Sequence, residues 1–132
     1  MAKRKRILVV DDEPATVEMI ADFLKSHDYE VLAAYDGKEG LHKARAEKPN
    51  LIILDVMMPK LDGYKVCWLL KFDKKYSHIP IIILTARAAP SDRETSLKSG
   101  ADAYLVKPLD PMRLLAMIRK LLREEGESLK TF

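Results

Sequence analysis

Four polar sites in the sequence each follow a short apolar segment. Asp11 and Asp12 follow residues 7–10, Asp55 follows 51–54, Thr85 follows 81–84, and Lys107 follows 104–106. If these segments are parallel strands, their carboxyl ends share one edge of a sheet, where ligands bind. The set would then combine three carboxylates, a hydroxyl and an ammonium group. Such a set suits a divalent metal and a phosphoryl group, with one carboxylate acting as nucleophile.

The chemistry of this set favours a hard cation. Three neighbouring carboxylates repel one another, and a bound cation relieves the repulsion. Oxygen ligands without nearby Cys or His favour Mg²⁺, with Mn²⁺ as an alternative. Lys107 could neutralise one phosphoryl oxygen, and Thr85 could donate a hydrogen bond to another, as phosphoryl transfer requires. Taken singly, each residue also has an ordinary interpretation, such as a helix cap, a turn cap, a strand residue or a solvated strand end.

Short apolar runs alternate with amphipathic stretches along the chain. We expect strands at residues 7–10, 29–34, 51–54, 81–84 and 103–106. Helical spacing and cap residues predict a helix after each strand, including one from Ser91-Asp92 to Gly100 and one after Asp110-Pro111. This alternation predicts an α/β fold, a doubly wound five-stranded parallel sheet of flavodoxin-like order 2-1-3-4-5 with helices on both faces. In that order, Asp11 and Asp12 lie beside Asp55.

Composition limits the class of protein. The chain has 132 residues, for which we expect one domain at 1–125 and a short tail at 126–132. The apolar runs are too short for a membrane span, so we expect a cytoplasmic protein without a membrane partner. A single cysteine, Cys67, excludes an intrachain disulfide. The net charge of +3 is mild, and the basic residues 3–6 are expected to form a solvated tail, with no direct binding of nucleic acid.

The chain resembles the response-regulator receiver domain (CheY-like) of two-component signal transduction. The matching stretches are ILVVDDE at 7–13, LDVMMPKLDG at 54–63, IILTA at 82–86 and GADAYLVKP at 100–108. The resemblance implies a phosphorylation-dependent switch rather than an enzyme. Asp55 would accept a phosphoryl group from a sensor histidine kinase or a phosphotransfer protein. Asp11, Asp12, Asp55 and the backbone carbonyl of Met57 would hold Mg²⁺.

The resemblance also assigns a readout. Thr85 and Lys107 would contact the phosphoryl group, and Tyr104 would turn inward when Thr85 moves. The surface made by the helix predicted from Ser91-Asp92 to Gly100, the strand at 103–106 and the helix after Asp110-Pro111 would then change and bind a downstream protein partner. Pro108 matches a proline that often follows a cis peptide bond in this family, although few X–Pro bonds are cis in general.

Three other functions compete with this interpretation. A metal-dependent phosphatase with an aspartyl nucleophile typically has a second Asp two residues later, where this chain has Met57. A flavin or nucleotide carrier needs a phosphate loop after the first strand, where Asp11 and Asp12 would repel phosphate. A receiver-like binding module that had lost phosphorylation would not be expected to keep the acidic set together with Thr85 and Lys107.

Some positions depart from OmpR/PhoB-like receivers, which dimerise through ion pairs. Ala103 and Met117 stand where that subfamily has an acid and an arginine, so one cross-subunit pair is missing. We therefore expect a monomer before phosphorylation. Val66, Leu69 and Leu70 form the predicted buried face of a helix, and Trp68 of the same helix lies off that face. It is either an exposed contact residue or a ring that lies flat against its own helix or a neighbouring one.

Overall fold

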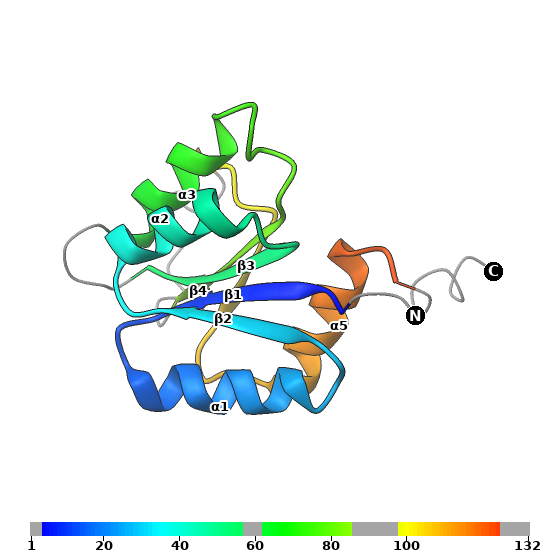
Figure 1. The fold of residues 1–132 in the computed structure, drawn as a ribbon. Coiled ribbons are helices and arrows are strands. Elements are labelled where there is room, and N and C mark those ends of the chain that lie inside the picture. Colours follow the sequence, from blue (N-terminus) through cyan, green and yellow to red (C-terminus); the bar gives the residue numbers. More distant parts are fainter. Residues whose placement is uncertain (1–3, 57–61, 86–97, 125–132) are drawn as a thin grey trace.

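Five parallel strands form one sheet in the order β2-β1-β3-β4-β5 (Figure 1). They are β1 (Arg6–Val10), β2 (Glu30–Ala34), β3 (Leu51–Asp55), β4 (Ile81–Thr85) and β5 (Ala103–Val106). The structure, a computed structural model, describes residues 4–56, 62–85 and 98–124. The predicted fold class and strand order are confirmed. Most of the helix predicted from residue 91 to 100 lies outside the described residues.

Helices cover both faces of the sheet (Figure 1). Helices α1 (Pro14–Lys25) and α5 (Pro111–Leu121) pack on one face, and α2 (Gly37–Glu47) and α3 (Gly63–Lys71) pack on the other. Alternate strand residues point to opposite faces, so β1 and β3 contribute side chains to both cores. The helix α5 ends at Leu121, before the expected terminator Gly126, which lies outside the described residues.

The two central strands β3 and β4 are buried at every residue, including the terminal Asp55 and Thr85. The sequence predicted that each strand would end one residue earlier. The ladder continues because the Val56 amide donates to the Leu84 carbonyl at 3.3 Å and the Lys107 amide to the Thr85 carbonyl at 2.7 Å. Both polar side chains therefore sit on rigid strand backbone rather than on a loop.

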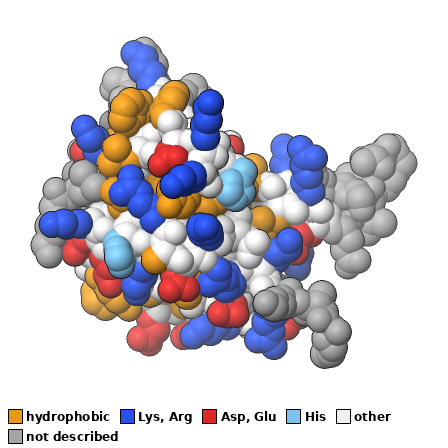
Figure 2. Space-filling model, turned by 45° about the horizontal axis from the view of Figure 1, so that its top comes forward, with side chains coloured by type: hydrophobic (Ala, Val, Ile, Leu, Met, Phe, Trp, Pro, Cys, Tyr) orange, Lys and Arg blue, Asp and Glu red, His pale blue; other side chains and the backbone are white. Residues whose placement is uncertain are grey.

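The buried face of α3 differs from the predicted one. Gly63, Val66, Cys67 and Leu70 are buried, whereas Leu69 is half-buried. Val66 and Leu70 are thus buried as predicted, and the small residues Gly63 and Cys67, rather than Leu69, complete the stripe that approaches the sheet. Trp68, which was predicted to lie off the buried face, is exposed, as is Phe72. Hydrophobic side chains gather beside several Lys and Arg side chains in the upper part of the space-filling view (Figure 2).

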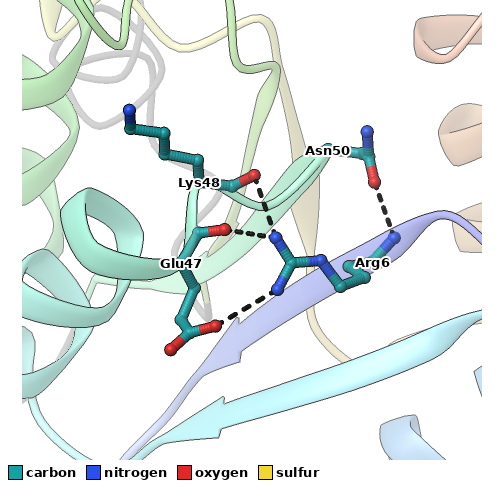
Figure 3. Close-up of polar contacts among 4 residues, drawn as sticks. All are labelled: Arg6, Glu47, Lys48 and Asn50. Atoms are coloured by element: carbon teal, nitrogen blue, oxygen red, sulfur yellow. Dashed lines mark hydrogen bonds and ion pairs between the residues drawn. The ribbon is translucent and has the colours of Figure 1, made fainter.

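Arg6 fastens the end of α2 to the start of the sheet (Figure 3). Its guanidinium donates to the Glu47 carboxylate at 3.2 Å and to the Glu47 and Lys48 carbonyls. Its backbone amide donates to the Asn50 side chain at 2.7 Å, and the Asn50 amide donates back to the Arg6 carbonyl at 2.8 Å. These contacts fix where β3 begins relative to β1.

A second polar cluster holds β5 against β4. The Lys71 ammonium, at the end of α3, donates to the Asp102 carboxylate at 2.9 Å and to the carbonyls of Ser77 and Ile79. The same Asp102 oxygen accepts the Ile81 amide at 2.8 Å. Gly100 has a φ of +87°, and a Cβ there would lie 2.9 Å from Lys71 Cβ. The Gly-Ala-Asp sequence at residues 100–102 therefore sets the path of the chain into β5, the strand that Lys107 follows.

Candidate functional site

Three carboxylates meet at the carboxyl edge of the sheet. Asp11 and Asp12 follow β1, and Asp55 ends β3, the neighbour of β1. One oxygen from each carboxylate lies within 4.8 Å of the other two. Asp11 and Asp55 are buried, with 1% and 4% of their surface exposed, while Asp12 is exposed. The strand order alone therefore brings together residues that are 44 positions apart.

Asp11 occupies the least solvated position of the three. Its Oδ1 accepts the Glu13 amide at 3.0 Å, and its buried Oδ2 has no hydrogen-bond partner. Burial is the main cause that raises the pKa of Asp11 to about 6; the Glu13 amide opposes the shift, and the Asp55 carboxylate adds to it. An ionised Asp11 therefore needs a cation beside it.

Lys107 is the cation that the chain itself supplies. Its ammonium lies 3.3 Å from Asp55 Oδ2 and 3.7 Å from Asp11 Oδ2. It follows β5 directly, and its backbone amide continues the ladder to Thr85. The peptide bond between Lys107 and Pro108 is cis, as the sequence predicted. One ammonium facing two carboxylates leaves net negative charge at the edge, to which Asp12 adds.

Thr85 and Tyr104 lie near the same edge, on adjacent strands. Thr85 ends β4 and is 1% exposed. Tyr104 lies on β5 opposite Ile83 and is half-buried against the core shared with α2 and α3. The structure thus brings the three carboxylates and Lys107 close together, ends the adjacent strand β4 with Thr85, and places Tyr104 farther back along β5. Met57, whose carbonyl was predicted as a metal ligand, lies outside the described residues.

One residue at the site, Gly63, was not predicted from the sequence to contact it. Gly63 begins α3, and its amide donates to the Val56 carbonyl at 3.3 Å. A Cβ on Gly63 would lie 2.4 Å from the Asp55 carbonyl oxygen and 2.7 Å from Val56 Cα. Only glycine allows this approach. The Asp62-Gly63 pair suggested a loop and a helix start, but a contact with the backbone of Asp55 has no local sequence signal.

The arrangement can bind a hard cation and present one carboxylate to an electrophile. Asp11 and Asp12 offer oxygens to a cation, Asp55 offers a second oxygen for attack, and Lys107 can balance added negative charge. The oxygen-only donor set fits Mg²⁺, which takes one or two carboxylates and keeps several waters.

No helix in the described ranges is long and apolar enough to cross a membrane.

Known protein sequences match most of the length of this chain. The model of the response regulator receiver domain family matches residues 7–119. A probable transcriptional regulator, ycf27, of Cyanophora paradoxa is 51% identical over 97% of this chain and 53% of its own length. The alkaline phosphatase synthesis transcriptional regulatory protein PhoP of Bacillus subtilis is 45% identical over 90% of this chain and 49% of its own length. The chain thus spans about half the length of these curated relatives.

Solved structures agree with the sequence matches. A CheY-like response regulator receiver domain protein from Methanospirillum hungatei superposes with a TM-score of 0.85, at 34% identity, covering 95% of this chain and 98% of that one. The chemotaxis response regulator CheY4 of Vibrio cholerae superposes with a TM-score of 0.83, at 32% identity, covering 89% and 98%. The chain belongs to the response regulator receiver domain family of two-component systems.

Proposed function

We propose that the chain is a phosphorylation-controlled signalling switch in which Asp55 accepts the phosphoryl group. The observation that carries this proposal is the buried Asp55 carboxylate at the end of β3, beside Asp11 and within 3.3 Å of the Lys107 ammonium. The donor is a phosphohistidine of a sensor kinase or a phosphotransfer protein. The chain assists this transfer but is not a turnover enzyme. Its domain is proposed to comprise residues 1–125, and its location is proposed to be cytoplasmic.

In the proposed transfer step, the Asp55 carboxylate is the nucleophile. A carboxylate oxygen forms a bond to phosphorus while the bond from phosphorus to the donor imidazole nitrogen breaks, and the nitrogen keeps the electron pair. The product is an acyl phosphate on Asp55. Lys107 stays close enough to pair with a phosphoryl oxygen, and the buried Thr85 hydroxyl ends the adjacent strand. Positioning and charge neutralisation are the main demands of such a transfer.

The carboxylate cluster is proposed to hold Mg²⁺, or Mn²⁺, through Asp11, Asp12, Asp55 and the Met57 carbonyl. The buried Oδ2 of Asp11 supports this assignment. It accepts no hydrogen bond, and the Lys107 ammonium 3.7 Å away is shared with Asp55, so an ionised Asp11 is only partly compensated. When bound, the ion neutralises phosphoryl oxygens and helps to align donor and acceptor.

The readout is proposed to run through Thr85 and Tyr104. The Thr85 hydroxyl donates to a phosphoryl oxygen on Asp55, and Tyr104 moves into the volume that Thr85 leaves. The surface of β5, α5 and the segment before β5 then favours a downstream protein partner. Phosphorylation shifts a population between two states because it interacts with them differently.

Replacing Asp55 is expected to abolish phosphorylation. Wild-type protein treated with a small acyl phosphate and Mg²⁺ should gain the mass of one phosphoryl group, while Asp55→Asn should gain none, and omission of Mg²⁺ should suppress the gain. Asp22→Ala, which removes an exposed carboxylate of α1, is the matched control and should behave as wild type. A phosphorylation level unchanged in Asp55→Asn, read by intact mass, would sink the assignment.

Replacing Asp11 by Asn is expected to stabilise the metal-free protein at neutral pH, by about 1–3 kcal/mol. The folded pKa of Asp11 is about 6 against 3.8 for the free side chain, so the folded state binds more protons between these values. The Asp11 contribution to the free energy of unfolding therefore falls as pH rises through this window. Urea unfolding of wild type and Asp11→Asn at pH 4.5 and 7.5, with a chelator present, measures this difference in the free energy of unfolding.

The Asn variant should show little of that pH-dependent loss in stability, because its side chain does not ionise. Its amide oxygen can still accept the hydrogen bond from the Glu13 backbone amide. Added Mg²⁺ should stabilise wild type more than Asp11→Asn at pH 7.5. A variant less stable than metal-free wild type at pH 7.5 would contradict the burial argument.

Lys107 is expected to matter for switching more than for binding the cation. An ammonium cannot ligate Mg²⁺, and it competes with the ion for Asp55 and Asp11. Lys107→Ala should therefore bind Mg²⁺ as tightly as wild type or more tightly in calorimetric titration. Lys120→Ala, which removes an exposed lysine of α5, is the control. A large loss of Mg²⁺ affinity confined to Lys107→Ala would be incompatible with this role.

A phosphoryl analogue such as beryllofluoride should perturb amide NMR signals mainly in residues 86–106. The reason is that Thr85 and Tyr104 transmit the change toward β5. Thr85→Ala should shrink these shifts, and Thr85→Ser, which keeps the hydroxyl, should restore them. Shifts confined to α1 and α2 would rule out this path.

A further inference from the structure

Helix α3 presents an exposed aromatic pair that the proposed switch does not use. Trp68 is 47% exposed, and Phe72, the residue that caps the helix, is 64% exposed. Their ring centroids are 5.4 Å apart with the planes inclined by 37°. The Trp68 ring thus lies against Phe72 of its own helix but keeps nearly half of its surface in solvent. Clustered exposed apolar side chains of this size often mark interaction sites.

The surface next to the pair is hollowed. A shallow depression of about 400 Å³ is lined by Asp62, Tyr64, Lys65, Trp68, Lys98 and Ser99. One indole ring therefore forms a wall of this depression and also contacts Phe72. A depression beside exposed rings can accommodate an apolar side chain from a partner.

Three exposed lysines lie close to the aromatic pair in the sequence. Lys65 lies one helical turn before Trp68, and Lys74 and Lys75 follow Phe72 in the next turn; all three are exposed. None of the three forms an ion pair within the part of the chain that the structure describes. The nearby carboxylates are engaged as caps, since Asp62 accepts the Lys65 amide at 3.0 Å and Asp73 the Lys75 amide at 2.9 Å. Figure 2 shows the mixture of hydrophobic and basic side chains on this face.

We propose that this α3 surface, made of Trp68, Phe72, Lys65, Lys74 and Lys75, docks an acidic segment of another protein. The segment carries an aromatic or aliphatic side chain between its carboxylates. The apolar side chain packs on the indole and phenyl rings, which supply the desolvated centre typical of binding hot spots. The lysines at the rim select for acidic flanks and speed the encounter. The proposal goes beyond the phosphorylation switch and does not depend on it.

Two other occupants fit the surface less well. A second copy related by two-fold symmetry would place the same lysines opposite one another, and like charges at an interface are unfavourable. Single-stranded nucleic acid needs open ring faces for base stacking. Here the two rings pack against each other, with centroids 5.4 Å apart, so that less of each ring face is open to a base.

A displayed library of short random peptides tests the proposal. Selection uses the whole chain, with counter-selection on the Trp68→Ala/Phe72→Ala variant. Enriched peptides should place Asp or Glu around an aromatic or aliphatic residue. Because Trp68 is the only tryptophan of the chain, a bound peptide without tryptophan should shift the protein fluorescence to shorter wavelength. Phe72→Ala and Lys65→Glu should each weaken binding by about tenfold, and Met19→Ala, which alters an exposed apolar residue of α1, should not.

Several results would overturn the proposal. Enrichment no greater than on the double variant, or enriched peptides that are neutral or basic, would remove the acidic partner. A single-stranded oligonucleotide that shifts Trp68 fluorescence would assign the surface to nucleic acid. In sedimentation the unmodified protein should be a monomer, and a dimer that Phe72→Ala dissociates would assign the surface to a second copy. If the double variant does not fold, Lys65→Glu, at an exposed position, decides alone: unchanged peptide affinity would contradict the proposal.

Discussion

Burial of the two central strands on both faces is the constraint on which the rest of the structure depends. All residues of β3 and β4 are shielded from water, including the polar groups of Asp55 and Thr85 that end them. A carboxylate at such a place is costly unless cations lie close. Lys107 meets part of this demand from β5, and its position depends on the contacts of Lys71 and Asp102 that hold β5 against β4. The buried core thus fixes the positions of the Asp55 and Thr85 side chains. It also creates the need for positive charge beside Asp55.

Much of the fold could be predicted because its signals are local or periodic. The uninterrupted apolar runs of β3 and β4 indicated strands buried on both faces, and the alternation with helices fixed a parallel sheet. Caps were also visible, since Asp62 and Asp110 accept backbone amides of α3 and α5 as expected of N-cap residues. The side chains of the candidate site followed from topology, because strand order decides which strand ends become neighbours.

The features that could not be predicted depend on contacts between distant segments. The burial of Gly63 and Cys67 beside the predicted Val66 and Leu70 depends on how closely these small residues approach the sheet, and no periodicity of large apolar residues indicates it. The contact of Gly63 with the Asp55 carbonyl is similar, since it joins two segments through backbone atoms. It also means that the start of α3 cannot move closer to β3 without displacing the backbone of Asp55. A ligand on α3 that preferred one position of this helix would bias the site, and the coupling would be reciprocal.

The two ends of the strands differ in electric charge. The carboxyl edge holds Asp11, Asp12 and Asp55, whereas Arg4, Lys5, Arg6 and Lys48 gather at the opposite edge around a depression that also contains Glu30 and Asn50. Strands of five residues separate these edges by about 16 Å. The two edges therefore carry charge clusters of opposite sign, which the net charge of +3 does not express. The basic cluster attracts an anionic partner and the carboxylates repel it, so an approach to Asp55 gains no steering from these two clusters.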